Sequence, residues 1–171
     1  WSGFGFWSVL IFLGFGTVLT LVLQSSSATM AITLIMLSMG WIPFPMACAM
    51  VLGENIGTTI TANIAASVGN HSAKRAALSH TIFNVFGVIW ALILFKPFLS
   101  LVGVITSGIF GIPDPAEEGF AVNDPKGPEA TAALYGLSML HTLFNTINTM
   151  ILIWFTGLIE KVVCKVSREP A

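Results

Sequence analysis

The chain has 171 residues, of which 55% are hydrophobic and only 9% are charged, and its mean hydropathy is +0.87. Soluble domains carry about 25% charged residues, so this composition excludes a water-soluble globule. The formal net charge of −1 excludes a nucleic-acid-binding protein, because such proteins need a basic patch. Runs of about 18 or more apolar residues are typical of membrane-spanning helices. We therefore expect an all-α integral membrane protein that contacts the lipid bilayer.

Residues 1–43 predict a re-entrant helical hairpin, which enters the membrane and returns to the same side. An apolar segment at 7–23 is followed by the polar run Gln-Ser-Ser-Ser at 24–27 and a second apolar segment at 28–39. One continuous helix over these residues would be about 50 Å long, which is too long for a hydrocarbon core of about 30 Å. The second segment, at about 18 Å, is too short to cross alone. The glycine, tryptophan and prolines at 40–45 indicate where the hairpin ends at the interface.

Residues 44–70 predict a broken span. They are apolar apart from the segment Gly-Glu-Asn-Ile-Gly-Thr-Thr at 53–59. Two glycines that flank polar residues inside an apolar run indicate an unwound stretch of helix. Non-helical backbone within a membrane is tolerated only where protein or a water-filled cavity covers it. A binding site is the usual reason for such a break, so we expect one here.

The rest of the chain completes what we take as a single transmembrane domain over 1–171. Residues 72–96 and 130–163 each predict a span. Between them, 97–129 predicts an interfacial segment followed by an external loop. That loop is rich in proline and carries five acidic residues against one lysine. Residues 164–171 are expected to form a cytoplasmic tail.

Basic residues predict the orientation of the chain. Lys74 and Arg75 lie in one short loop, while Lys161, Lys165 and Arg168 lie at or beyond the end of the last span. Two crossings separate these groups, so both fall on the same side, and the positive-inside rule assigns that side to the cytoplasm. The C-terminus is then cytoplasmic and the acidic loop external.

The run from Gln24 to Thr29 is the first candidate site. Its members are Gln24, Ser25, Ser26, Ser27 and Thr29. A helix that starts here exposes unsatisfied N–H groups and the positive end of its dipole, and serines can cap that end while offering hydroxyls. Such an end binds anions readily. The structural alternative is that small hydroxyl side chains only let helices pack closely; three successive serines beside a helix start favour the site.

The segment at 53–59 is the second candidate site. The Asn55 amide and the Thr58 and Thr59 hydroxyls are hard oxygen ligands, of the kind that alkali cations take at broken helices. Glu54 is the one carboxylate expected at membrane depth. An ionisable residue there indicates function, although a protonated, hydrogen-bonded structural role is the alternative.

The charge pattern links the two candidates. The predicted spans contain no Lys or Arg at depth, so an anion would have only dipoles and hydroxyls to offset its desolvation. A cation that binds with it would supply the missing positive charge. We therefore expect the anion and the cation to bind together.

Two further segments repeat one pattern. His80 and Asn84, and again His141 and Asn145, stand four residues apart on one helix face. The repetition suggests two similar helices that pack on one scaffold. We favour interhelical hydrogen bonding over a functional role for these residues.

The ordered set of these motifs resembles the sodium-dependent inorganic phosphate cotransporters, and most of all their bacterial branch. The set comprises the Gln-Ser-Ser-Ser run at 24–27, the segment at 53–59, Lys-Arg-Ala-Ala at 74–77 and His-Thr-Ile-Phe-Asn at 80–84. The resemblance implies sodium-coupled phosphate import across a plasma membrane, in bacteria the inner membrane. It assigns phosphate to Gln24 and the three serines, and sodium to Asn55, Thr58 and Thr59, with sodium as coupling ion and no other cofactor.

The resemblance also implies an architecture. The family is built from two inverted repeats, and this chain carries the motifs of one, which fits the second. We expect the other repeat to come from the same parent chain or from a second copy. The family often has a small residue where Glu54 stands, which raises the hypothesis of proton coupling.

Two other functions compete with this one. An intramembrane serine hydrolase would use Ser25, Ser26 or Ser27 as nucleophile and His80 or His141 as base. Three adjacent serines give no unique nucleophile, and no Gly-x-Ser-x-Gly elbow is present, so we do not expect an enzyme. A non-coupled anion channel or a structural subunit is the third possibility, and stoichiometric sodium dependence of the flux separates it from a cotransporter.

Overall fold

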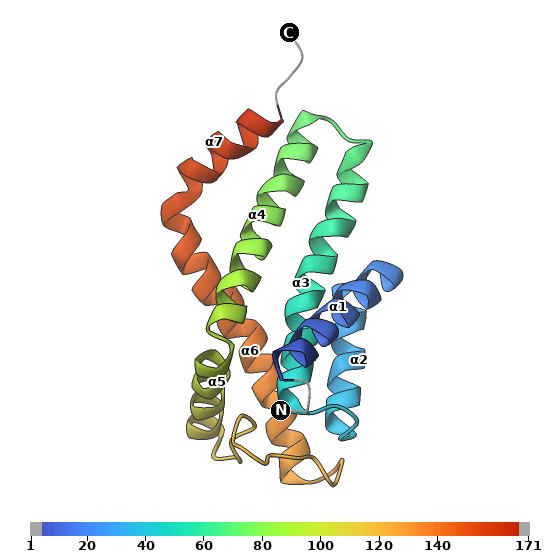
Figure 1. The fold of residues 1–171 in the computed structure, drawn as a ribbon, viewed down its shortest axis with the longest axis vertical. Coiled ribbons are helices and arrows are strands. Elements are labelled where there is room, and N and C mark those ends of the chain that lie inside the picture. Colours follow the sequence, from blue (N-terminus) through green and yellow to red (C-terminus); the bar gives the residue numbers. More distant parts are fainter. Residues whose placement is uncertain (1–4, 168–171) are drawn as a thin grey trace.

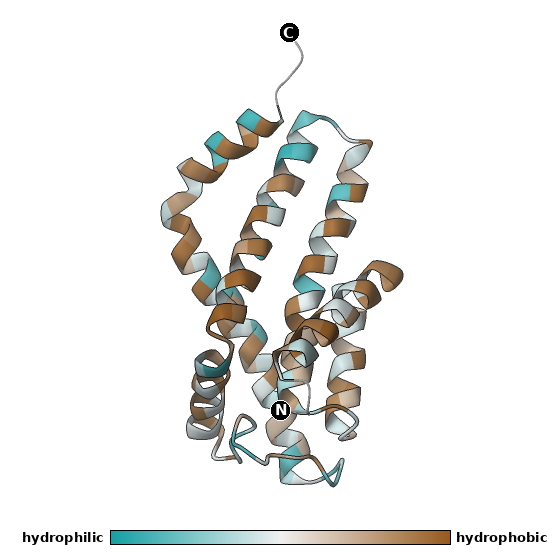
Figure 2. Ribbon diagram, in the orientation of Figure 1, coloured by the Kyte–Doolittle hydropathy of each residue, from teal (hydrophilic) through white to brown (hydrophobic). Residues whose placement is uncertain are grey.

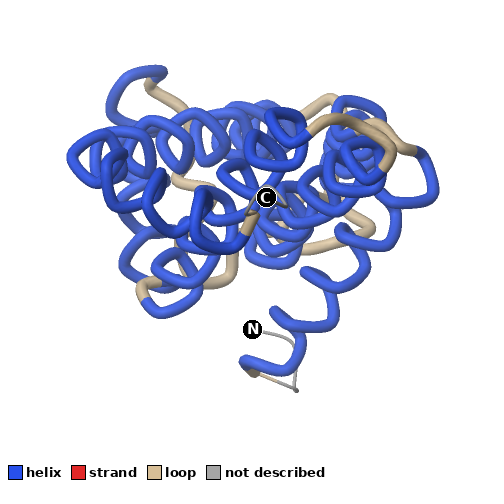
Figure 3. The backbone as a smooth tube through the Cα atoms, turned by 90° about the horizontal axis from the view of Figure 1, so that it is seen from above, coloured by secondary structure: helices blue, strands red, loops and turns tan. Residues whose placement is uncertain are grey.

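The computed structural model describes residues 5–167, and over that range it contains helices and loops but no strand (Figures 1 and 3). The all-α prediction is confirmed. Three helical stretches within the described part are long and apolar enough to cross a membrane: Phe6–Leu23, His71–Ile93 and Pro128–Val166. Trp1, Arg168 and the end of the predicted tail lie outside the described residues. The elements are α1 (Phe6–Leu23), α2 (Ser26–Ser38), α3 (Phe44–Ser67), α4 (His71–Ile93), α5 (Phe95–Phe110), α6 (Pro128–Leu152), the 3₁₀ helix η1 (Ile153–Phe155) and α7 (Thr156–Val166).

The first two helices are separated at the polar run that the sequence singles out. α1 ends at Leu23, Gln24 adopts a left-handed conformation with φ 52° and ψ 29°, and Ser25 caps α2. The chain then reverses direction, so that α2 runs back beside α1 and α3 (Figure 1). The hydroxyl oxygens of Thr20 and Thr29 lie 3.0 Å apart and join the two helices. The position of this helix pair in the membrane as a re-entrant hairpin stays a prediction.

The predicted break at 53–59 is wrong. α3 is one continuous helix of 24 residues. The polar side chains in the segment find acceptors on their own helix: Asn55 Nδ2 donates to the Val51 carbonyl over 2.9 Å, and Thr58 Oγ1 donates to the Glu54 carbonyl over 2.8 Å. Because local side-chain-to-backbone bonds satisfy these groups within a helix, the polar composition does not require unwinding.

The two glycines of this segment serve close packing. A Cβ atom on Gly53 would collide with the carbonyl oxygen of Leu13 on α1, and one on Gly57 would come within 2.7 Å of Thr20 Cβ. The contact is reciprocal, since a Cβ on Gly16 of α1 would collide with the Met50 carbonyl of α3. Small residues at such a crossing let two membrane helices approach closely. The glycines therefore mark the seam between α1 and α3.

The N-terminal half of α3 forms the centre of the molecule. Every residue from Met46 to Leu52 is at most 1% exposed. This helix packs against α1, α2, α4 and α6. Large apolar side chains on the outer faces stay exposed, among them Trp7 at 70% and Val22 at 74%. Hydrophobic residues predominate along α1, whereas hydrophilic ones gather near the α3–α4 turn and on α7 (Figure 2), a distribution suited to lipid around the middle.

The remaining helices follow the predicted order with different ends. α4 occupies most of 72–96 and is capped by Asn70, whose Oδ1 accepts from the Ala73 amide over 2.9 Å. Much of the predicted interfacial segment is the helix α5, and its depth in a membrane stays a prediction. The predicted span at 130–163 corresponds to a helical stretch of 39 residues. A straight helix of that length would be about 58 Å long, but the chain bends at η1 and α7 takes a new direction (Figure 1).

The two ends of the molecule differ in charge. Arg75 Nε and Nη2 donate to the Ser167 carbonyl over 3.3 and 3.1 Å, which ties the start of α4 to the end of α7. The acidic loop between α5 and α6 lies at the opposite end (Figure 1). The basic segments therefore share one end of the molecule, as the charge pattern predicts.

Candidate functional site

The start of α2 presents polar groups that its own helix does not use. Ser25 Oγ accepts from the Ala28 amide over 3.2 Å, which caps the helix. The first N–H groups of any helix lack intrahelical acceptors, and those of Ser26 and Ser27 belong to this class. Within the described chain, the hydroxyls of Ser26 and Ser27 make no hydrogen bond either. These groups are available to a ligand.

These serines open onto a cavity of about 280 Å³ between four helices. Seven of its eight lining residues have polar side chains, and they include residues that the sequence assigns to two separate candidate sites. The lining residues are Ser26, Ser27 and Met30 from α2, Glu54, Asn55 and Thr58 from α3, His80 from α4 and His141 from α6. The structure thus brings the start of α2 and the middle of α3 to one space.

Four predicted site residues do not line the cavity. Gln24 is exposed, and Ser25 serves as the α2 cap. Thr29 is fully buried, with its Oγ1 3.2 Å from the Ser25 carbonyl. Thr59 is 2% exposed and donates to the Ile56 carbonyl. Ser25, Thr29 and Thr59 therefore hold the backbone around the cavity.

Gln24 has an unusual backbone. Among the described residues it is the one non-glycine residue with positive φ. The left-handed region costs an L-residue about 1–2 kcal/mol, and such strained positions cluster at functional sites. Glycine would adopt this turn without strain, so a glutamine here raises the hypothesis that its side chain has a role beyond the turn.

Glu54 is the one carboxyl group that lines the cavity. It is 4% exposed, and its Oε2 has no hydrogen-bond partner among the described residues. No Lys or Arg lines the cavity. A buried carboxylate without a partner is costly unless it is neutralised by a proton or a cation. The Glu54 carboxyl group therefore requires either a proton or a bound cation.

The neighbours of Glu54 offer oxygen ligands. The Asn55 Nδ2 and Thr58 Oγ1 protons are already donated to α3 carbonyls, which leaves the oxygen lone pairs of Asn55 and Thr58 free to accept. The described residues contain no cluster of three or more His, Cys, Asp and Glu side chains that could hold a metal. A single carboxylate with neutral oxygens suits a hard cation rather than a transition metal.

His80 and His141 line the cavity, although the sequence analysis favoured a packing role for both. The expected interhelical bonds of the repeated motifs are wrong for their asparagines, because Asn84 and Asn145 donate to the carbonyls of His80 and His141 on their own helices. Asn148 joins α4 and α6 instead: its Nδ2 donates to the Phe83 carbonyl over 2.9 Å, and its Oδ1 accepts from Trp90 Nε1 over 3.2 Å. The recurrence of one motif on two helices was the available signal.

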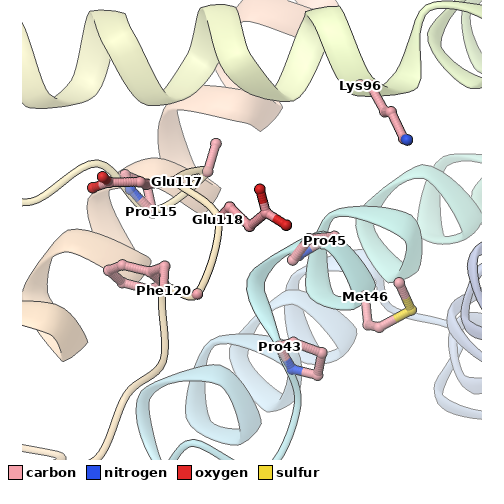
Figure 4. Close-up of a pocket in the computed structure, with 10 residues that line it drawn as sticks. Pro43, Pro45, Met46, Lys96, Pro115, Glu117, Glu118 and Phe120 are labelled. Carbon is pink, nitrogen blue, oxygen red and sulfur yellow. The ribbon is translucent and has the colours of Figure 1, made fainter. Parts of the chain in front are cut away.

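A second cavity, of about 410 Å³, lies where the acidic loop meets the start of α3 and α5 (Figure 4). Figure 4 shows the Lys96 ammonium and the Glu118 carboxylate on opposite sides of it. Glu117 and Glu118 are exposed, and none of the predicted site residues lines this space. We therefore place the candidate site at the cavity between α2, α3, α4 and α6.

Apolar helices around a cavity lined by polar side chains are typical of membrane transport proteins. The profile of the Na⁺/Pi-cotransporter family matches residues 8–112, which include the start of α2, all of α3 and all of α4. The chain therefore belongs to the Na⁺/Pi-cotransporter family, a family of membrane phosphate transporters.

Individual relatives agree with this assignment. The chain is 41% identical to protein YqeW of Bacillus subtilis over 112 residues, which are 66% of this chain and 34% of YqeW. It is 38% identical over 101 residues to the human sodium-dependent phosphate transport protein 2C, covering 54% of this chain and 17% of that protein. It is 30% identical over 98 residues to the putative inorganic phosphate export protein YjbB of Escherichia coli K12, covering 57% of this chain and 17% of YjbB. The chain thus spans about a third or less of these relatives. No solved structure shows a significant match to the chain.

These relatives bear on the serine hydrolase alternative. Ser26, Ser27, His80 and His141 do line one cavity, but no hydrogen bond joins a serine hydroxyl to an imidazole among the described residues. Proteins 2C and YjbB are named as transporters. The names of these relatives are consistent with transport rather than catalysis.

Proposed function

We propose that this protein imports inorganic phosphate together with sodium across the plasma membrane. Phosphate binds at the start of α2, through the amides and hydroxyls of Ser26 and Ser27. Sodium binds beside it on α3, at Glu54, Asn55 and Thr58. Gln24 adds a side-chain amide to the phosphate site. Ser25 and Thr29 support that site, and Thr59 supports the sodium site, through their hydrogen bonds at the α2 start and within α3. One observation carries the proposal: both sets of groups line one cavity, where the buried Oε2 of Glu54 has no partner.

The start of α2 suits phosphate for two reasons. The helix dipole and free amides attract negative charge. The serine hydroxyls add donors that rotate to suit the ligand. Phosphate at neutral pH keeps a proton that sulfate lacks, and Glu54 or Gln24 would accept it. Sulfate cannot donate this hydrogen bond, so its binding free energy should be less favourable than that of phosphate by about 1–3 kcal/mol.

Sodium couples to phosphate through charge. A phosphate placed near the unpaired Glu54 carboxylate would be repelled, since no lysine or arginine lines the cavity. Sodium on the carboxylate removes the repulsion and attracts the anion. Such coupling is reciprocal and amounts to about 5–150-fold in affinity.

The direction of transport follows from the coupling. Cells keep sodium low inside, so obligatory co-binding drives phosphate inward. The name of protein 2C includes sodium dependence, whereas YjbB is named as an export protein. Vesicles with imposed sodium gradients decide between these directions for the present protein. Phosphate accumulation that follows an inward sodium gradient supports import, and accumulation that is indifferent to the gradient contradicts it.

The proposal includes a topology and a partner. The end of the molecule that carries Lys74, Arg75 and α7 faces the cytoplasm, with the C-terminus there, and the acidic loop faces outward. Ser27 and Gln24 are exposed, so the α2 start has an open side. The other inverted repeat, from the same parent chain or a second copy, covers this side and completes the site.

The test compares matched serines of one helix. Phosphate uptake is measured in vesicles that contain wild type, Ser26→Ala, Ser27→Ala or the control Ser38→Ala, which lies at the other end of α2. We expect the first two to raise the phosphate concentration for half-maximal uptake about tenfold, as for one hydrogen bond to a charged ligand. Ser38→Ala should behave as wild type. Equal phosphate affinities in all four proteins would refute the site.

A further inference from the structure

The cavity contains two groups to which the proposed function gives no role. His80 and His141 come from different helices, α4 and α6, and both line the space that Ser26, Ser27 and Glu54 also line. Histidine is the side chain whose ordinary pKa lies between pH 5 and 8. Since no Lys or Arg lines the cavity, the imidazoles are its only side chains that can carry a positive charge.

The imidazoles are free to meet a ligand. Asn84 and Asn145, the other halves of the two motifs, bond to the main chain of His80 and His141 and leave the rings alone. Neither ring makes a hydrogen bond to another residue in the described part of the protein. A buried polar core would use these groups structurally, whereas here they face open space.

The helices around the two imidazole rings carry few titratable side chains. α1 and α2 carry no titratable side chain. α3 contributes Glu54 to the cavity and keeps Cys48 buried in the core. The other titratable groups of α4 and α6 do not line the cavity: His71, Lys74, Arg75, Glu129 and Tyr135. α5 and α7 also pack against α4 or α6, and their charged side chains do not line the cavity either: Lys96, Glu160, Lys161 and Lys165. Glu54, the two imidazoles and the bound ions therefore set the charge of this space.

We propose that His80 and His141 contact phosphate and make its dependence on sodium vary with pH. This inference rests on the proposed function of the same cavity. When protonated, each imidazole donates a hydrogen bond to a phosphate oxygen and supplies positive charge that sodium otherwise supplies alone. Phosphate then binds at lower sodium concentration. When neutral, the rings contribute less and sodium becomes essential.

The test measures phosphate uptake over a range of sodium concentrations at pH 6 and pH 8. The proteins are wild type, His80→Gln, His141→Gln, the double variant and the control His71→Gln, which is on α4 but does not line the cavity. In wild type, half-maximal sodium should fall about fivefold or more from pH 8 to pH 6. The double variant should lose this shift, each single variant part of it, and His71→Gln none. Phosphate's own ionisation is common to all five proteins and cancels in the comparison.

A second measurement uses only wild-type protein, so it does not depend on the folding of a variant. Diethyl pyrocarbonate modifies accessible imidazoles, and mass spectrometry locates the modified residues. Phosphate with sodium should protect His80 and His141 and leave His71 unaffected. Equal modification with and without these ions overturns the inference.

Failure of the inference is distinct from failure of the proposed function. A double variant with the wild-type pH shift overturns the role of the histidines, while sodium-dependent phosphate uptake that is sensitive to Ser27→Ala upholds the site. Wild-type protein without any sodium dependence removes the proposed function, and the inference with it.

Discussion

The hydroxyl of Thr17 on α1 lies 2.9 Å from the carbonyl oxygen of Gly53 on α3. At this crossing a Cβ on Gly53 would collide with the Leu13 carbonyl. α1 therefore supports α3 directly beside Glu54, on the seam where small residues allow contact. A continuous helix, and not an unwound segment, therefore carries Glu54, Asn55 and Thr58, the proposed cation ligands.

Gly53→Ala should destabilise the protein by about 1–3 kcal/mol, because the added methyl group must push two backbones apart. Gly14→Ala is the matched control, since a Cβ on Gly14 of α1 has no neighbour within 4 Å. Alanine favours the helix by about 0.5–1 kcal/mol over glycine, so the control should be neutral or stabilising. Thermal unfolding in detergent measures both, and equal midpoints for the two variants would contradict the packing role.

Asn148→Leu should destabilise the contact between α4 and α6. Asn148 is fully buried, and its loss leaves the Trp90 indole N–H without an acceptor. An unsatisfied buried group costs about 1–3 kcal/mol. Asn145→Leu serves as control, because Asn145 bonds only to its own helix. The midpoint of thermal unfolding should be lower for Asn148→Leu than for Asn145→Leu. The reverse order would show that the interhelical bond contributes little to stability.

The variant Gln24→Gly tests the contribution of the Gln24 side chain separately from that of the left-handed turn. Glycine adopts the left-handed turn freely, so the stability of this variant should stay within about 1 kcal/mol of wild type or exceed it. If the Gln24 amide binds phosphate, affinity should still fall about tenfold, as it should in Gln24→Ala. Isothermal titration with phosphate in sodium buffer measures the effect. Wild-type affinity in Gln24→Gly would assign the residue to the turn alone.

Glu54→Gln should weaken sodium binding. The variant keeps the size of the side chain and removes the negative charge, so the sodium concentration for half-maximal uptake should rise about tenfold or more, as for the loss of a charge-assisted contact. Glu160→Gln, on the exposed surface of α7, is the control and should leave sodium dependence unchanged. An unaltered sodium curve in Glu54→Gln would remove this carboxylate from the cation site.

Much of the fold follows from apolar runs and their interruptions. Serines after Gln24 predict a new helix start, and α2 does begin at Ser26. Glycine patterns are harder to interpret, because the same Gly53 and Gly57 suit both an unwound backbone and a close crossing. The helix that packs against these glycines decides between the two structures. Here that helix is α1, which is distant in sequence. Composition alone carries no information about this pairing.

The candidate site divides in the same way. Residue type alone was enough to recognise the hydroxyl and amide side chains of the two polar segments and the one carboxylate at membrane depth. Five of these predicted site residues line the cavity: Ser26, Ser27, Glu54, Asn55 and Thr58. His80 and His141 resembled packing residues, since only the relative rotation of α4 and α6 turns them toward it. Asn148 lacked any repeated motif, so its bridge to Trp90 and Phe83 could not be anticipated.

The central claim is that phosphate and sodium bind together in the cavity between α2 and α3. Labelling of Ser27→Cys tests it most directly, in a Cys164→Ser background that removes the exposed native thiol while Cys48 stays buried. A charged thiol reagent should label this cysteine quickly, and phosphate with sodium should slow labelling about tenfold or more, as expected for ligand at ten times its dissociation constant or above. Phosphate in potassium buffer should protect little, and Ser38→Cys should not respond. Labelling of Ser27→Cys at one rate in all buffers would contradict the account.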